Sequence, residues 1–238
     1  MKQFILLLVL IPLLSTSCRY RGNSVRGSGR ISTQQRSVSN FTGLETDGSI
    51  DIQVAQGDYK VEVEADENIQ QYIETVVENG KLKVRFRNGT WLNHYNRAVV
   101  HVRAPVLNDF ETHGSGNITG DGKIADAQRM NIVISGSGDI ELNLDCPAIV
   151  TETHASGNIT LSGDCKSINT KIFGSGNLEA KHLKSETANI EVHGSGDSEI
   201  FASESLDVKI YGSGDVRYDG SPKISSDIHG SGSVEKEE

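Results

Sequence analysis

The sequence predicts an all-β protein, a parallel two-sheet β-solenoid (β-helix-like) with repeats of about 19 residues that turn at Gly-Ser-Gly motifs. First, a Gly-Ser-Gly-Asn/Asp motif or a close variant occurs seven times between residues 114 and 233, at spacings of 18 to 22 residues. Second, apolar or β-branched residues alternate with polar ones on both sides of most copies, as in strands with one buried face. Third, 25 glycines and only 5% aromatic residues suit a narrow, layered interior better than a wide globular core.

The N-terminus predicts export. Lys2, the apolar run Phe4 to Leu14 and the small residues that follow read as a signal peptide over residues 1–17. Cys18 comes next, an arrangement that resembles the lipobox of bacterial lipoproteins, in which this cysteine is acylated after cleavage. An ordinary signal peptide followed by a chance cysteine is the alternative. We therefore expect an outer-membrane lipoprotein held by a lipid on Cys18, at the cell surface or in the periplasmic leaflet.

Residues 18–105 divide into a tether and a first β region. Residues 18–38 have hardly an apolar side chain, which predicts a flexible, lipid-anchored tether. Residues 39–105 show period-two alternation and predict an N-terminal β segment of the solenoid. Between Asp66 and Val77, where apolar residues fall at helical spacing, we expect one short helix or helical turn. The segment 88–96 contains Trp91, the only tryptophan, and is either a cap over the end of the solenoid or an exposed binding loop.

Residues 106–238 form the predicted Gly-Ser-Gly-repeat β-solenoid. Each repeat reads as strand, tight turn, strand and looser turn, so that one repeat makes one coil. Glycine permits the sharp turn, and the Asn or Asp can bond its own backbone or the same residue of the next coil. The predicted turn residues are Gly114, Gly116, Asn117, Gly136, Gly138, Asp139, Gly157, Asn158, Gly174, Gly176, Asn177, Gly194, Gly196, Asp197, Gly212, Gly214 and Asp215.

The outward-facing positions predict how the coils stack. Three residues before each motif, acidic residues mostly alternate with Lys171, Lys209 or Val133; one residue before it, histidines alternate with Ser135, Phe173 or Tyr211. Because opposite charges stabilise neighbouring strands and like charges repel, this alternation favours one stack in register over a coil of two repeats, about 39 residues, in which Glu would lie on Glu. The candidate binding strip is His154, Phe173, His193, Tyr211 and His229.

Cys146 and Cys165 occupy the same place in adjacent repeats. Stacking in register would bring their Cα atoms within disulfide range, and export would permit oxidation. A disulfide between coils and a pair of free thiols are both open.

Several chemistries are disfavoured. The net charge of −9 and the absence of a basic block argue against nucleic acid, and the 19-residue period does not fit the nine-residue calcium repeats. The recurrent Glu-x-His pairs could suit a metal, but we interpret them as a solvated surface ladder and expect no metal or cofactor. No convergent carboxylate pair, nucleophile motif or dinucleotide motif occurs, so we expect no enzyme.

The repeated Gly-Ser-Gly-Asn/Asp-Ile turns resemble the head GIN domain family of autotransporter-type adhesins, largely secreted or lipid-anchored proteins of Bacteroidetes. So do Phe41-Thr42-Gly43-Leu44, Ile50-Asp51-Ile52-Gln53-Val54 and Ala65-Asp66-Glu67-Asn68-Ile69. The likeness covers about residues 38–234. It implies a two-sheet β superhelix without catalytic residues and a role in adhesion.

We expect a non-enzymatic cell-envelope lipoprotein that acts as an adhesion or interaction module and binds glycan or a surface protein through its flat faces. The alternatives are a periplasm-facing structural or envelope-stress protein and, more distantly, a polysaccharide-active β-helix enzyme. The oligomeric state is left open by the sequence.

Overall fold

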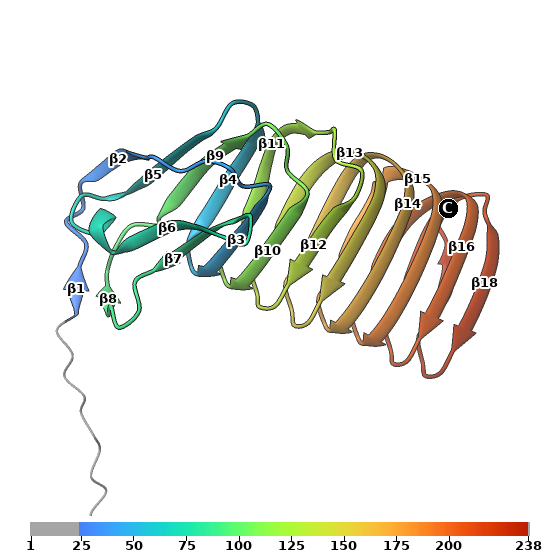
Figure 1. Cartoon of the computed structure of the whole chain (residues 1–238). Helices are drawn as coiled ribbons and strands as arrows, with labels where there is room; N and C mark the ends of the chain where they lie inside the picture. Colours follow the sequence, from blue (N-terminus) through green and yellow to red (C-terminus); the bar gives the residue numbers. More distant parts are fainter. Residues whose placement is uncertain (1–23, 238) are drawn as a thin grey trace, which may run out of the picture.

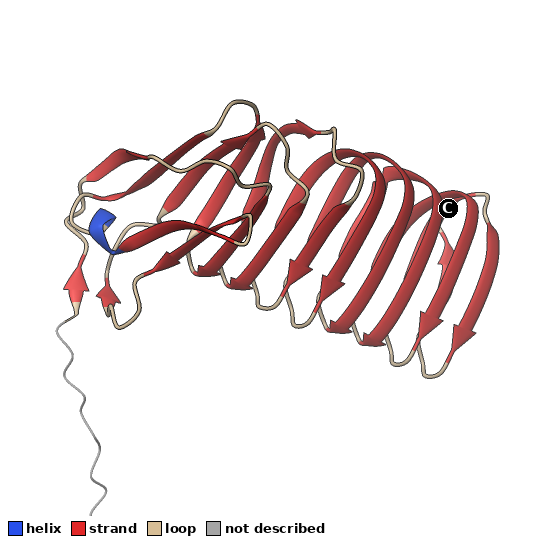
Figure 2. Cartoon of the chain, viewed as in Figure 1, coloured by secondary structure: helices blue, strands red, loops and turns tan. Residues whose placement is uncertain are grey.

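Stacked coils of parallel strands make up most of the computed structural model, which describes residues 24–237 (Figure 1). The predicted signal peptide and Cys18 lie outside the described residues. The strands are almost the only regular structure, apart from one short helical turn (Figure 2). Within the described residues, no helix is long and apolar enough to cross a membrane.

The N-terminal part contains nine strands and one 3-10 turn. They are β1 (Val25–Arg26), β2 (Ile31–Arg36), β3 (Gly43–Gly48), β4 (Asp51–Gln56), β5 (Lys60–Asp66), η1 (Gln70–Tyr72), β6 (Ile73–Glu78), β7 (Lys81–Phe86), β8 (Leu92–Asn93) and β9 (Val99–Ala104).

The repeat region continues with ten strands. They are β10 (Asp109–Gly114), β11 (Ile118–Ile124), β12 (Met130–Ile134), β13 (Ile140–Thr153), β14 (Ile159–Gly174), β15 (Leu178–Gly194), β16 (Ser198–Ile210), β17 (Val216–Gly220), β18 (Lys223–Ile228) and β19 (Val234–Lys236).

Each coil contributes to two sheets. We call the strands that lead into the motifs the entry sheet (β3, β10, β12, β18 and the second halves of β13 to β16) and those that leave them the exit sheet (β4, β11, β17, β19 and the first halves of β13 to β16). β13 to β16 are 13 to 17 residues long because each bends around the corner opposite the motif. Because β13 to β16 run through both the entry and the exit sheet, hydrogen bonds join all described strands except β1 and β8 into one continuous network.

The register confirms the single stack. Glu111 lies beside Val133, Val133 beside Glu152, and Glu152 beside Lys171. Glu191, Lys209 and Asp227 continue the same row. Each repeat is therefore one coil, and the two-repeat alternative is wrong.

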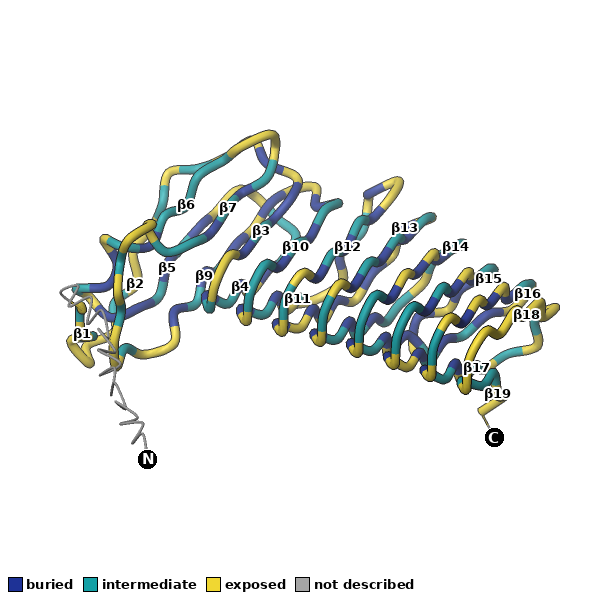
Figure 3. Tube along the Cα trace, turned by 90° about the horizontal axis from the view of Figure 1, so that it is seen from below, coloured by how far each residue is buried: buried dark blue, intermediate teal, exposed yellow. Residues whose placement is uncertain are grey.

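The core lies between the two sheets. Buried and exposed residues alternate along the strands (Figure 3), and the inward positions are mostly Ile, Leu and Val with relative exposures of 0 to 2%. Burial of one such side chain contributes about 2 kcal/mol. The core runs through the N-terminal part as well, where Phe41 and Leu44 are fully buried.

Of the short helix or helical turn predicted between Asp66 and Val77, the structure contains the single turn η1 and no longer helix. β5 extends to Asp66, and Ile73–Glu78 is strand β6, antiparallel to β7. Thr75, Val76 and Val77 are β-branched and favour a strand, and the Asn79-Gly80 turn lets this segment pair with Lys81–Phe86.

The predicted tether over residues 18–38 is wrong for its described strands. β1 pairs with β8, and β2 runs antiparallel along β5 from Ile31 to Arg36. The side chains of β2 are largely exposed, so backbone hydrogen bonds to a strand edge order this segment instead of apolar burial.

Candidate interaction surface

The motif forms a corner of each coil, and the second glycine is required by close packing between corners. A Cβ atom added at Gly138 would lie 2.1 Å from the carbonyl oxygen of Gly116, and one added at Gly176 would lie 2.2 Å from that of Gly157. The same holds at the second glycine of every other copy, with gaps of 2.1 Å. These glycines therefore let the corners of neighbouring coils approach each other closely.

The Asn and Asp residues of the motif form a ladder along this corner. Each side-chain Oδ1 accepts a hydrogen bond from the backbone N–H of the equivalent residue in the next coil, at 2.8 to 3.1 Å. The ladder satisfies backbone donors that the turn would otherwise leave unpaired. These side chains could have bonded their own backbone or the equivalent residue of the next coil, and in the structure they bond the next coil.

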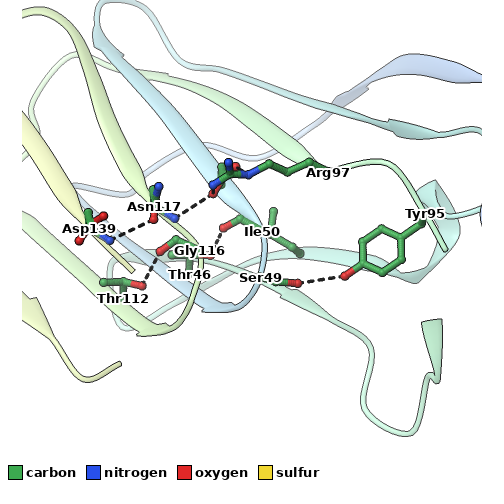
Figure 4. Close-up of polar contacts among 10 residues, drawn as sticks. Thr46, Ser49, Ile50, Tyr95, Arg97, Thr112, Gly116, Asn117 and Asp139 are labelled. Carbon is green, nitrogen blue, oxygen red and sulfur yellow. Dashed lines mark hydrogen bonds and ion pairs between the residues drawn. The ribbon is translucent and has the colours of Figure 1, made fainter. Parts of the chain in front are cut away.

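The ladder begins one coil earlier than the sequence indicated. Oδ1 of Asp51 accepts from the backbone N–H of Asn117 at 2.9 Å and also binds Arg97 (Figure 4). Thr46 Oγ1 donates to the carbonyl of Ile50, as Thr112 Oγ1 does to Gly116 (Figure 4). Residues 48–51 are thus an eighth, degenerate copy of the motif, Gly-Ser-Ile-Asp. Sequence reasoning missed it because Ile50 replaces the second glycine and β5 to β9 interrupt the period.

The outer face of the entry sheet carries three columns of side chains in register. The first, five residues before each motif, is mainly polar: Asp109, Asn131, Val150, Asn169, Asn189, Asp207 and Ser225. The second is the charged row described above, in which Lys171 Nζ lies 3.7 Å from Glu191 Oε2. The third contains the rings of the predicted binding strip. The sequence reasoning used only the second and third columns.

The five strip residues lie in one continuous stack. Ring centroids from His154 through Phe173, His193 and Tyr211 to His229 are 4.8 to 5.3 Å apart, with interplanar angles of 6 to 16°. Each inner ring therefore has both faces covered by its neighbours. The strip presents ring edges to solvent, and stacking of a ligand on the inner ring faces is excluded.

The strip histidines are paired with acidic residues two positions earlier on their own strands. His193 Nε2 lies 2.7 Å from Glu191 Oε1, and His154 Nε2 lies 2.9 Å from Glu152 Oε1. The hydrogen bond from His193 lowers the pKa of Glu191, and although burial opposes this shift, the charge of Lys171 supports it. These acid–histidine pairs fit the predicted surface ladder.

One group of possible metal ligands lies at the N-terminal end of the same face. The ligand atoms of Glu45, Glu111 and His113 lie within 4.8 Å of one another. Lys83 Nζ binds Glu45 at 3.1 Å and Lys81 Nζ binds Glu111 at 2.5 Å. Burial opposes charging of Lys81, but its hydrogen bonds to Asp109 and Glu111 outweigh that effect and raise its pKa. Because lysines already neutralise these carboxylates, the group is best described as an ion-pair cluster.

Cys146 and Cys165 lie side by side in register, but both are free thiols. The disulfide alternative is therefore not what the structure contains. Cys146 Sγ instead donates to the carbonyl of Ala148 at 3.3 Å. Burial raises the pKa of the Cys165 thiol to about 12.

A concave groove of about 430 Å³ on the exit side was also missed by sequence reasoning. Its charged lining comes from β5, β9 and β11: Lys60, Glu62, His101, Arg103 and Asp121. β5 and β9 pair antiparallel, and their contact is long-range in sequence, so no local pattern could have indicated it.

Segment 88–96 has features of both a cap and a loop. Tyr95 packs edge-on against Phe86, with ring centroids 5.6 Å apart, and its hydroxyl lies 3.0 Å from that of Ser49 (Figure 4). Trp91, in contrast, is 61% exposed. Tyr95 closes the end of the core, whereas the indole faces solvent.

Known proteins with the same architecture include three solved structures. A putative adhesin from Bacteroides fragilis has a TM-score of 0.84 at 21% identity, with 90% of this chain and 100% of that chain covered. A putative lipid binding protein from Parabacteroides distasonis has a TM-score of 0.73 at 25% identity, with the same coverage. A putative adhesin from Parabacteroides merdae has a TM-score of 0.71 at 22% identity, covering 91% and 100%. At 21% and 22% identity the two adhesins share the fold with this chain.

No curated protein matches the sequence. The model of one family, described as a putative auto-transporter adhesin, head GIN domain, matches residues 40–222. This match spans most of the chain and includes all but the last copy of the turn motif. The protein therefore belongs to the head GIN domain family.

Proposed function

We propose that this protein is a non-enzymatic adhesion module of the cell envelope, exported as a lipoprotein on Cys18, that binds a glycan across the outer face of the entry sheet. The observation that carries the proposal is the set of three columns in register, which repeat polar groups at the strand spacing of about 4.8 Å. A polymer with regularly spaced hydroxyl groups can meet such a surface repeatedly, and many weak contacts then add to a useful affinity. The family's description as adhesins supports this class of function.

The stacking of the strip rings limits how a glycan could bind to the entry sheet. Because the inner strip rings cover one another's faces, the ligand would meet ring edges, the amides of Asn169 and Asn189, and the carboxylate of Asp207. These three residues are exposed and adjacent in the first column. Hydrogen bonding to hydroxyl groups fits this surface better than stacking of sugar rings on aromatic faces.

The test is binding of the soluble chain, residues 19–238, to glycan arrays and to immobilised surface proteins. If the first column carries binding, Asn169→Ala with Asn189→Ala should weaken it roughly thirtyfold, since two hydrogen bonds of about 1 kcal/mol each are lost. Glu179→Ala on the exit sheet is the matched control and should leave binding unchanged. Loss of binding in Arg103→Ala but not in the column variant would move the site to the exit-side groove and overturn the proposal. Binding to immobilised proteins but to no glycan would contradict the proposed glycan ligand.

A periplasm-facing structural role is the second candidate, and the self-paired acid–histidine ladder favours it because those groups need no external partner. Protease treatment of intact cells separates the two roles. Cleavage of the solenoid on whole cells supports the adhesin, whereas protection until the outer membrane is permeabilised supports the periplasmic protein.

A further inference from the structure

The N-terminal end of the molecule differs in charge from the rest. Residues 19–40 contain five arginines and no acidic residue, although the whole chain has a net charge of −9. Arg26 and Arg30 are exposed; Glu67 lies 3.0 Å from Arg30, and the buried carboxylate of Asp66 accepts a hydrogen bond from the backbone N–H of Gly29, between the two arginines, at 2.6 Å. Both partners of the Arg30–Glu67 pair are at least 48% exposed, so solvent weakens it. Residues 19–40 are therefore a basic segment of the chain whose described part lies beside acidic residues of β5 and of the turn that follows it.

The single tryptophan lies at this same end. The backbone oxygen of Trp91 accepts a hydrogen bond from the backbone N–H of Val25 at 2.7 Å, and Arg26 lies beside Asn93 in the β1–β8 pair. β1 and β8 are together at one end of the solenoid, and the C-terminus is at the other (Figure 1). A 61% exposed indole is costly in water, whereas tryptophan and arginine are both favoured at a membrane–water interface.

The length of chain that precedes β1 keeps this end close to the proposed anchor. Val25 follows Cys18 by seven residues, which span at most about 24 Å. A lipid on Cys18 would therefore hold Trp91 and the arginines within a short distance of the headgroups. A basic segment next to a membrane anchor is attracted to anionic headgroups, and residues 19–40 supply such a segment.

We propose that this N-terminal end is a membrane-docking surface, in which Trp91 enters the interface of a bilayer that contains anionic phospholipid and the exposed residues Arg26 and Arg30 contact its phosphates. The proposal rests on the acylation of Cys18 in the proposed function. Docking orients the molecule: the long axis of the solenoid points away from the bilayer, and the C-terminal coils of the binding face lie farthest from it.

Because Trp91 is the only tryptophan, its fluorescence tests the proposal without any substitution. The full acylated protein is reconstituted into vesicles of phosphatidylethanolamine and phosphatidylglycerol whose acyl chains are brominated, since bromine quenches indole on contact. We expect the emission to fall roughly twofold or more and to shift to shorter wavelength, as for an indole at the interface. Arg26→Gln with Arg30→Gln should reduce the quenching, and vesicles without phosphatidylglycerol should reduce it similarly.

The matched control moves the probe to the far end. In Trp91→Phe with Tyr211→Trp, the only indole lies in the ring strip and should stay unquenched. Equal quenching of both probes would mean that the solenoid lies flat on the bilayer, which overturns the proposal. An unquenched Trp91 in protein that floats with the vesicles overturns it too. Protein that fails to float would instead refute the lipid anchor, so the two failures are distinguishable.

Discussion

The second position of each motif must be glycine, because a carbonyl oxygen of the neighbouring coil leaves no room for a Cβ atom there. Gly176→Ala would place a methyl group 2.2 Å from the Gly157 oxygen, and the backbone of both coils would have to move apart. We expect a loss of about 2 kcal/mol or more in the free energy of unfolding, measured by urea denaturation. Ser175→Ala, at the exposed neighbouring position, should change it by less than about 0.5 kcal/mol. A fully stable Gly176→Ala variant would show that the corners are not closely packed.

Ser198 breaks the pattern of the exit sheet. It lies between Leu178 and Val216 in register, is 1% exposed, and its hydroxyl has no hydrogen-bond partner. A buried polar group without a partner costs about 1 to 3 kcal/mol. Ser198→Val should therefore raise the free energy of unfolding by about 1 kcal/mol, and Ser198→Ala by less. Destabilisation by both substitutions in thermal unfolding would mean that the hydroxyl is satisfied.

The thiol of Cys165 should react slowly. Burial raises its pKa from 9.0 to about 12, which lowers the reactive thiolate fraction about a thousandfold. Iodoacetamide at pH 8 should label Cys165 only after denaturation, as followed by mass spectrometry without reductant. Fast labelling of the native protein would contradict the pKa shift. No labelling after denaturation would mean that Cys146 and Cys165 are joined after all.

At the scale of one strand, the pairing of Glu191 with His193 should make stability depend on pH. The hydrogen bond from His193 lowers the pKa of Glu191 below its ordinary value of 4.5, with burial opposing and Lys171 and Lys209 supporting the shift. A carboxyl group whose pKa is lowered on folding stabilises the protein above its unfolded pKa, and this contribution is lost as the pH falls through the folded pKa.

The substitution His193→Phe keeps a ring in the stack and removes this hydrogen bond. We expect the variant to be less stable than wild type at neutral pH, and the difference in unfolding free energy between them to shrink as the pH falls below about 4.5. Glu191→Gln serves as the control: because its side chain does not titrate, adding His193→Phe to it should change the unfolding free energy equally at all pH values. An equal difference at all pH values would assign the effect of His193 to ring packing alone.

Features of the strands that repeat locally could be predicted from the sequence, whereas features that depend on distant segments could not. Period-two alternation and the motif spacing predicted the coil, the register and the ring strip, because each depends on local pattern repeated many times. The position of β2 and the exit-side groove depend on pairing between distant segments, which no repeat encodes. The missed motif at Gly48–Asp51 lies beside the Gly-Ser-Gly corner at Gly114 on one side only. On its other side lies the loop before β9, where the Asp51 N–H donates to the carbonyl of Ala98. The close approach that requires a second glycine is therefore relaxed at Ile50.

At the scale of the whole molecule, the two ends of the solenoid are finished differently. At the N-terminal end, β9, β5 and β2 extend one sheet, β7 and β6 extend the other, and Tyr95 packs against the core. At the C-terminal end, all six residues of β18 are exposed, and Ile224 and Ile228 are 44% and 40% exposed. Within the described residues, β18 pairs with β16 on one side only.

This asymmetry predicts a gradient of local stability. In a solenoid each coil is held by its neighbours, so the last coil can open without the others. Hydrogen–deuterium exchange should be much faster in peptides of β18 and β19 than in those of β14, whereas β5 and β9 should remain protected because strands cover them on both sides. If β18 exchanges as slowly as β14, its open edge must be covered by a second copy of the chain. Slow exchange that is lost when the protein is diluted would identify such end-to-end association. We expect none, because the acidic residues Glu235 and Glu237 lie near that edge and would repel a second copy.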